Sequence, residues 1–362
     1  MKKLFCLVAL CLFLPIPFSS ALTFNINYDS SVTVLTNAAQ VEAAFATAAQ
    51  AFHDLYTNEA TINLTIYWGP TGPFSGGISL GRSQFLLIDA TYAQITNALH
   101  LHRASAADTN SVASLPATDP SGTGNWVVPL AEARVLGLYP KSNSTEDGEI
   151  GFATNVSYTF DPNNRSVTGK FDFIAVAQHE LSEVLGRATT ELDASFGFLP
   201  YDLFRFTNSG IRSLDLSTTT NAYFSVDNGV TRLKFFYTNH LAGDIQDWKS
   251  SGTPDSFDAF SSSGHLNPLS TVDITALDVL GYNGLPLEPP HLYFTNLAGG
   301  NFQLRFVNSP GASFTVLAAT NAAQPLATWF VLGAATESAA GQFQFTDTTA
   351  TNKFRFYTVR SP

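Results

Sequence analysis

The sequence has almost no sulfur. Its two cysteines, Cys6 and Cys11, and its single methionine, Met1, all lie within the first eleven residues. The rest of the chain therefore has no thiol for catalysis, for a zinc ribbon or for a disulfide. A folded chain without disulfides must be held together by its apolar core or by bound ions.

Basic charge is also scarce. Only 13% of the 362 residues are charged, against a usual share of about 25%, and 18 Lys and Arg face 29 Asp and Glu. Nucleic acids and anionic lipid surfaces attract proteins through clustered lysine and arginine. We therefore expect no nucleic-acid partner, and no membrane partner for the mature form. The 45% share of hydrophobic residues indicates a folded protein with a sizeable core.

The N-terminal segment has the pattern of a secretory signal peptide. Two lysines precede an apolar run over residues 4–18, and small residues follow up to Ala21. Two prolines interrupt the run, which is shorter than the ~20 apolar residues of a membrane-spanning helix. We expect residues 1–21 to be removed and the mature protein to be secreted, either outside the cell or into a periplasm.

A proline-rich stretch, residues 286–290, predicts a linker between two domains. The segment after it, residues 291–362, has short aromatic and β-branched runs at regular spacing, with period-two alternation in Phe302–Phe306. This pattern is typical of a small all-β sandwich. It contains no residues that suggest chemistry, so a stabilising or attachment module is the simplest interpretation.

The first domain, residues 22–285, mixes strand and helix patterns and predicts an α+β fold. It opens with strand, helix and strand patterns, which predict a βαβ start. The predicted strands are 23–28, 61–68, 149–154 and 156–160, and the predicted helices are 39–56, 90–102 and 129–136. Residues 104–124 are rich in Ser, Thr, Asp and Gly and predict a long exposed loop.

The segment 171–187 carries the most chemical information. Apolar residues recur at helical spacing between Asp172, a predicted N-cap, and Gly186, a predicted helix end. His179 and Glu183 are four residues apart, so both project from one helix face and could bind one cation. Glu180 lies beside them, where it could accept a proton from water. The alternative is a helix with surface carboxylates and a hydrogen-bonded histidine.

The residues 179–187, followed by 202–206 and 273–282, resemble a family of secreted bacterial metalloproteases that is similar to the metzincins. The resemblance covers most of the first domain. It implies a zincin fold, with a twisted sheet, a metal-site helix beneath it and a smaller C-terminal subdomain that closes the cleft.

The same resemblance implies His179 as a ligand of Zn²⁺, Glu180 as general base, and Glu183 in place of the second histidine of the zinc-peptidase motif. The metzincin pattern places a third ligand at position 189, where this chain has a threonine. Asp202 is the expected substitute, with Asp193, His240 and His265 as alternatives. The methionine that metzincins place beneath the metal is missing.

Two carboxylates among three ligands weaken the selectivity for zinc, so another divalent ion such as manganese or calcium could also bind. The negative charge of Glu183 also cancels part of the field of the cation. A separate acidic segment contains Asp244, Asp247, Asp255 and Asp258. Its spacing fits no calcium-loop motif, so we expect a solvated loop there.

The sequence therefore predicts a secreted zinc-dependent endopeptidase that acts on protein or peptide substrates. The substrate would pair as an added strand along residues 149–154. The alternative is a catalytically inactive exported binding or surface protein with a degenerate zincin site.

Overall fold

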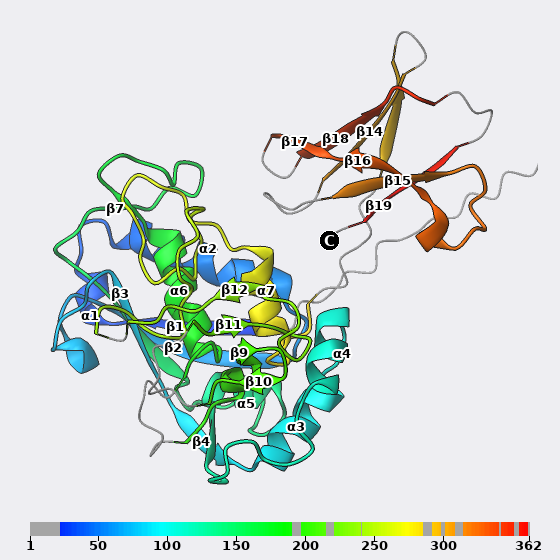
Figure 1. Cartoon of the computed structure of the whole chain (residues 1–362). Helices are drawn as coiled ribbons and strands as arrows, with labels where there is room; N and C mark the ends of the chain where they lie inside the picture. The colour runs from blue at the N-terminus through cyan, green and yellow to red at the C-terminus, as the bar shows by residue number, and fades with distance from the viewer. Residues whose placement is uncertain are drawn as a thin grey trace, which may run out of the picture.

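The structure is a computed structural model that describes residues 22–189, 197–214, 221–239, 241–284, 292–297, 301–307, 314–339, 342–350 and 355–360. These residues form a mixed α and β fold, as predicted (Figure 1). The expected signal peptide and the expected linker lie outside the described residues. None of the helices in the described ranges has the length and apolar character that a bilayer crossing requires.

A four-stranded sheet forms the centre of the N-terminal part. Its strand order is β1 (Leu22–Tyr28), β2 (Ala60–Trp68), β6 (Gly148–Phe152) and β3 (Gly81–Phe85). The first three strands run parallel, and β3 pairs antiparallel with β6. The strand expected to bind the substrate, at 149–154, corresponds to β6. That expectation is wrong, because β6 has partners on both sides and β3 forms the edge.

Helices α2 and α6 pack against this sheet. Helix α2 (Ala38–Leu55) connects β1 to β2, which confirms the predicted βαβ start. It contacts β1 and also α6 (Phe173–Val184), and α6 in turn contacts β3 and β6. The two helices lie side by side in Figure 1. Helix α6 therefore lies against the half of the sheet that ends in the edge strand.

Both ends of α6 follow the prediction. The side chain of Asp172 accepts a hydrogen bond from the backbone N–H of Ala175 and caps the first turn. At the other end Gly186 has φ 116°, in the region that favours glycine. The N–H of Gly186 donates to the carbonyl of Glu183, and the N–H of Arg187 donates to that of Ser182. This pair of bonds is a Schellman motif, which folds the chain back toward the helix.

The predicted loop at 104–124 contains a helix, so that prediction is wrong in part. Helix α4 (Ala106–Ala113) begins with a capping box between Ser105 and Asp108, and it buries Val112. Its apolar pattern is weak because Val112 is its one large apolar residue. It is held by tertiary contacts, among them a 2.5 Å hydrogen bond from Ser105 Oγ to Asp278 Oδ2 in α7 (Thr271–Asp278).

The remaining elements of the N-terminal part are short. The predicted helices at 90–102 and 129–136 correspond to α3 and α5, and the strand at 156–160 shrinks to two residues. The elements are α1 (Ser30–Thr33), η1 (Gly72–Phe74), β4 (Leu87–Ala90), α3 (Tyr92–Leu101), β5 (Trp126–Pro129), α5 (Leu130–Val135), β7 (Tyr158–Thr159) and β8 (Phe171–Asp172).

A second small sheet follows α6 along the chain. Its strand order is β10 (Ile211–Arg212), β9 (Arg205–Asn208), β11 (Tyr223–Phe224) and β12 (Lys234–Phe235), preceded by the short helix η3 (Pro200–Phe204). The segment from 241 to 261 has no helix or strand but is tied to α7. Trp248 is completely buried, and its indole N–H donates to Asp273 Oδ1 at 2.7 Å.

Two antiparallel sheets form the C-terminal part and share a small core of Leu304, Phe306, Phe314, Val316 and Phe343. The run with period-two alternation, Phe302–Phe306, lies within the second strand of this part. The elements are β13 (Tyr293–Asn296), β14 (Phe302–Val307), β15 (Thr315–Ala319), η5 (Leu326–Thr328), β16 (Phe330–Ala334), β17 (Thr336–Ala339), β18 (Gln342–Asp347) and β19 (Phe356–Arg360).

The contact between α4 and α7 predicts a pH-dependent stability. Burial, and then the charge of Asp108, raises the pKa of Asp278 to about 7. The folded state therefore binds a proton that the unfolded chain releases near pH 4, so this contribution to stability is lost as the pH rises from about 4 to about 7. Asp278→Asn removes the titrating group but keeps an acceptor for Ser105. Between pH 5 and pH 8, we expect its unfolding free energy to rise relative to wild type by on the order of 2 kcal/mol.

Urea unfolding at several pH values measures this difference. Ser105→Ala is the control, because it removes the hydrogen bond and keeps the titrating carboxyl. Parallel pH profiles for wild type and Asp278→Asn would show that Asp278 does not titrate in this range.

Candidate metal centre

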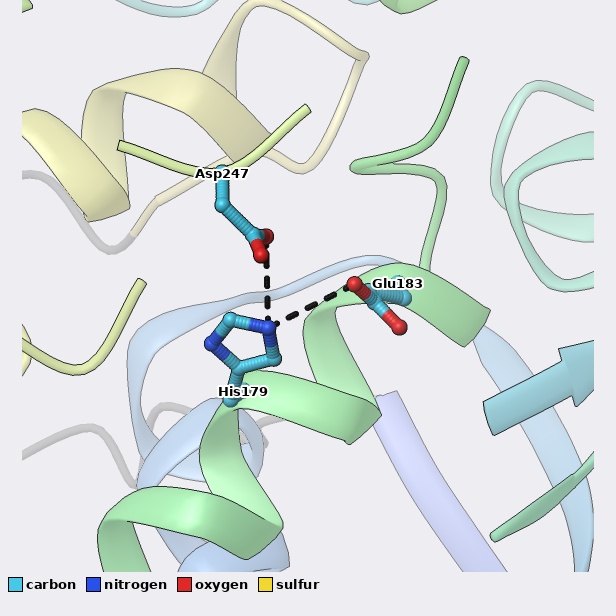
Figure 2. A group of neighbouring side chains, drawn as sticks. All are labelled: His179, Glu183 and Asp247. Atoms are coloured by element: carbon cyan, nitrogen blue, oxygen red, sulfur yellow. Dashed lines mark ion pairs between the residues drawn. The ribbon is translucent and has the colours of Figure 1, made fainter. Parts of the chain in front are cut away.

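Three side chains from two distant segments meet in one group that could hold a metal ion: His179 and Glu183 of α6, and Asp247 of the segment before α7 (Figure 2). His179 Nε2 lies 3.2 Å from Asp247 Oδ1 and 3.5 Å from Glu183 Oε1. One ligand atom from each residue lies within 4.8 Å of the others. Among the described residues, no other group of three or more His, Cys, Asp and Glu side chains comes this close together.

The ring of His179 is oriented by a backbone carbonyl. Its Nδ1 lies 2.9 Å from the carbonyl oxygen of Ser256. A carbonyl can only accept, so Nδ1 carries the proton and Nε2 faces the two carboxylates. A bare lone pair facing two anions is unfavourable unless a proton or a cation lies between them. Metal-ligating histidines usually have this kind of second hydrogen bond, so the donor set fits a divalent cation.

The charges of the group are strongly coupled. Burial lowers the pKa of His179, but the charge of Asp247 and the hydrogen bonds to Asp247 and Glu183 outweigh it, so the pKa lies well above its usual value. Burial raises the pKa of Glu183, and the interactions with His179 and Arg187 lower it to about 2. Without a cation, the imidazolium of His179 and the guanidinium of Arg187 together balance the charge of Glu183 and Asp247. A metal ion would have to displace that proton.

The carboxylate of Glu183 is held on both of its oxygens. Ser83, on the edge strand β3, donates its hydroxyl to Oε2 at 2.6 Å. Gln246 donates its side-chain amide to Oε1 at 3.2 Å, and Arg187 Nη2 lies 3.4 Å from the same oxygen. These contacts connect the edge strand, α6 and the segment that carries Asp247.

Glu180 lies next to this group and packs against the edge strand. A Cβ added at Gly81 of β3 would lie 2.3 Å from Glu180 Oε1, so only a glycine lets the strand approach this closely. Among the described residues, none donates a hydrogen bond to the Glu180 carboxyl. Burial and the charge of Glu183 raise its pKa well above the usual range. A cation bound nearby would lower it again.

The group lies in a cleft of about 1280 Å³. The edge strand β3 and residues 77–80 line one side, and the side chains of His179, Glu180 and Glu183 line it from α6. Residues between 241 and 247 and between 255 and 261 also line it. The candidate metal centre therefore lines the same cleft as the edge strand of the sheet.

The structure brings His179 and Glu183 together as their spacing suggested, but Asp202 is not part of the group. Asp202 is 1% exposed and belongs to η3, where its Oδ2 accepts from the N–H of Leu199 at 3.0 Å. It serves as a local cap, so the expectation of Asp202 as third ligand is corrected. Of the alternatives, His265 is exposed, and Asp193 and His240 lie outside the described residues.

Asp247 belongs to the acidic segment that the sequence predicts to be a solvated loop, and that prediction is wrong in part. Asp244 is indeed exposed, but Asp247, Asp255 and Asp258 are buried. Asp247 is 3% exposed and lies beside the completely buried Trp248. The large apolar neighbour was the available signal, because a surface loop seldom contains a buried tryptophan.

The geometry predicts which aspartate binds metal. We expect Asp247→Asn to lower the affinity for Zn²⁺ or Mn²⁺ by at least about tenfold, because it removes an anionic ligand. Asp202→Asn is the matched control and should bind as wild type does. Calorimetric titration of chelator-treated protein measures both affinities. Loss of binding in Asp202→Asn but not in Asp247→Asn would restore the ligand set expected from the sequence.

Comparison with models of protein families, with curated proteins and with solved structures found no match. The resemblance to metzincin-like proteases therefore stays a prediction.

Proposed function

We propose that this protein is a secreted, metal-dependent endopeptidase of the zincin type. One observation carries the proposal: a histidine and a carboxylate one turn apart on α6 meet a second carboxylate, Asp247, in a cleft beside an edge strand. Glu180, adjacent to the histidine, adds a carboxyl that faces the same cleft. These are the parts that hydrolysis of a peptide bond by activated water requires.

The surroundings of α6 support the zincin type. The helix contacts β3 and β6, and β3 is antiparallel to its neighbour and has one unpaired edge. The second small sheet and α7 follow later in the chain, and the segment between them supplies Asp247. This order agrees with a metal-site helix under a twisted sheet and a C-terminal subdomain that closes the cleft.

His179, Glu183 and Asp247 would hold the ion. One imidazole and two carboxylates suit Zn²⁺, and they also accept harder ions such as Mn²⁺. When bound, a divalent cation supplies a Lewis acid that polarises the scissile carbonyl and activates water. The hydrogen bond from Nδ1 to Ser256 and those from Ser83 and Gln246 to Glu183 keep the ligand atoms in place.

The substrate would bind as an extended strand along β3. The unpaired edge of this strand offers backbone N–H and carbonyl groups to a peptide, as in other cases of strand addition. The Ser83 side chain ties the strand to Glu183, so a peptide on this edge would lie close to the ligands. β3 thus replaces residues 149–154 as the proposed substrate strand.

Glu180 would move the proton. Its carboxylate accepts a proton from the attacking water, whose oxygen forms the new bond to the carbonyl carbon. The same group then donates that proton to the amine nitrogen as the C–N bond breaks. Its place against Gly81 restricts its side chain, which favours a fixed position for transfer.

A second candidate is an exported binding protein with an inactive site. It is favoured by the charge balance of the cluster, because His179 as an imidazolium and Arg187 together neutralise Glu183 and Asp247 without any ion. In that case the cluster would be a buried ion-pair network that holds α6 to the segment 241–261.

The proton-transfer role predicts the effect of Glu180→Gln. Because an amide cannot accept the proton, we expect kcat for cleavage of an unfolded protein substrate to fall by about 10²-fold or more. Metal affinity should stay within about twofold of wild type, since Glu180 is not a ligand. Glu149→Gln on β6 is the isosteric control and should keep full activity. Undiminished cleavage by Glu180→Gln would exclude this mechanism.

Metal content separates the two candidates. The purified protein should contain about one divalent transition-metal ion per chain, and a chelator should abolish cleavage until Zn²⁺ or Mn²⁺ is added back. Metal analysis and a fluorescent proteolysis assay measure this. A protein without metal and without chelator-sensitive cleavage would favour the inactive binding protein.

A further inference from the structure

Arg187 packs against the candidate metal centre, and each of the three nitrogens of its guanidinium group has a partner there. It is 0% exposed, and its Cζ lies 4.5 Å from the centre of the Phe257 ring. Nη1 lies 2.6 Å from Asp247 Oδ1, and Nη2 lies 3.4 Å from Glu183 Oε1. The third nitrogen, Nε, donates to Ser182 Oγ at 2.7 Å.

The oxygens that Arg187 contacts are the ones that face His179. Asp247 Oδ1 and Glu183 Oε1 are also the atoms 3.2 Å and 3.5 Å from His179 Nε2. The guanidinium therefore determines which oxygen of each carboxylate is presented to an ion. A planar fork with several donors can hold two carboxylates at once, whereas the single ammonium of lysine cannot reproduce this geometry.

We propose that Arg187 is a positioning residue of the metal centre: its two terminal nitrogens hold the ligand oxygens of Asp247 and Glu183 toward His179. The proposal rests on the metal site of the proposed function. Gly186 makes it possible, because the Schellman motif at the end of α6 turns the chain so that Arg187 folds back onto Glu183 of its own helix.

Arg187 also offsets the unusual ligand Glu183. A glutamate in place of a neutral histidine adds one negative charge to the ligand set, and Arg187 adds one positive charge in contact with it. The pair has the net charge of a histidine. Arg187 also contacts Asp247, so it lowers the cost of burying the two carboxylates close together, because an unpaired buried charge would be costly.

The test compares Zn²⁺ and Mn²⁺ binding by wild type, Arg187→Lys and Arg134→Lys in calorimetric titrations. Arg134 is a matched control, since it is also 0% exposed and its Nε lies 2.7 Å from Asp147, in a network that does not include the metal centre. We expect Arg187→Lys to lower the Zn²⁺ affinity by at least about tenfold, as loss of groups that orient ligands does. Arg134→Lys should keep the affinity within about twofold.

If Arg187→Lys does not fold, Ser182→Ala tests the same role of Arg187. It removes the partner of Nε without changing a charge, and we expect a loss of Zn²⁺ affinity of about threefold. Thermal unfolding with and without Zn²⁺ gives a second measurement, in which the stabilisation by Zn²⁺ should shrink in both variants but not in Arg134→Lys.

The outcomes distinguish the two proposals. A wild-type protein that binds neither ion overturns the proposed function, and the role of Arg187 with it. A wild type that binds, together with Arg187→Lys and Ser182→Ala variants that bind equally well, overturns the role of Arg187 alone. An equal loss in Arg134→Lys also overturns it, because the effect would then be one of general stability.

Discussion

The buried ion pair between Arg187 and Asp247 is the contact on which the site depends. It joins the end of α6 to a segment 60 residues later in the chain, at 2.6 Å, with both side chains almost completely excluded from solvent. Removing one partner of such a pair would leave an uncompensated buried charge, which costs about 3–5 kcal/mol. The pair thus keeps the segment 241–261 against α6, and with it Asp247 and the Ser256 carbonyl that orients His179.

The edge strand β3 packs against the candidate metal centre. Ser83 reaches Glu183 and Gly81 lies against Glu180, so the same strand touches both acidic residues of α6. Since β3 is antiparallel to β6 and unpaired on its other side, the cleft combines a free strand edge with a candidate metal centre. Hydrolysis of a bound peptide would use both features at once, which is why we propose it.

Local patterns predicted the elements whose stability is largely local. The βαβ start and α6, with its Asp172 cap and Gly186 end, follow from periodicity and capping, because these depend on residues close in sequence. The sequence did not predict α4, which is short and is held by α7. It also did not predict which strand lies at the edge of the sheet. Which strand lies at the edge depends on the order of strands in the sheet, and β3 enters that order out of sequence.

The sequence by itself determined that His179 and Glu183 share a helix face and that Glu180 lies beside them, because helical geometry makes residues four apart neighbours. Only the tertiary structure decided which residue joins His179 and Glu183 as the third candidate ligand. Asp202 follows α6 more closely in the chain but is used as a cap of η3, whereas Asp247 is drawn in by Arg187 and the burial of Trp248. Long-range pairing of buried charges sets that choice, and neither spacing nor composition encodes it.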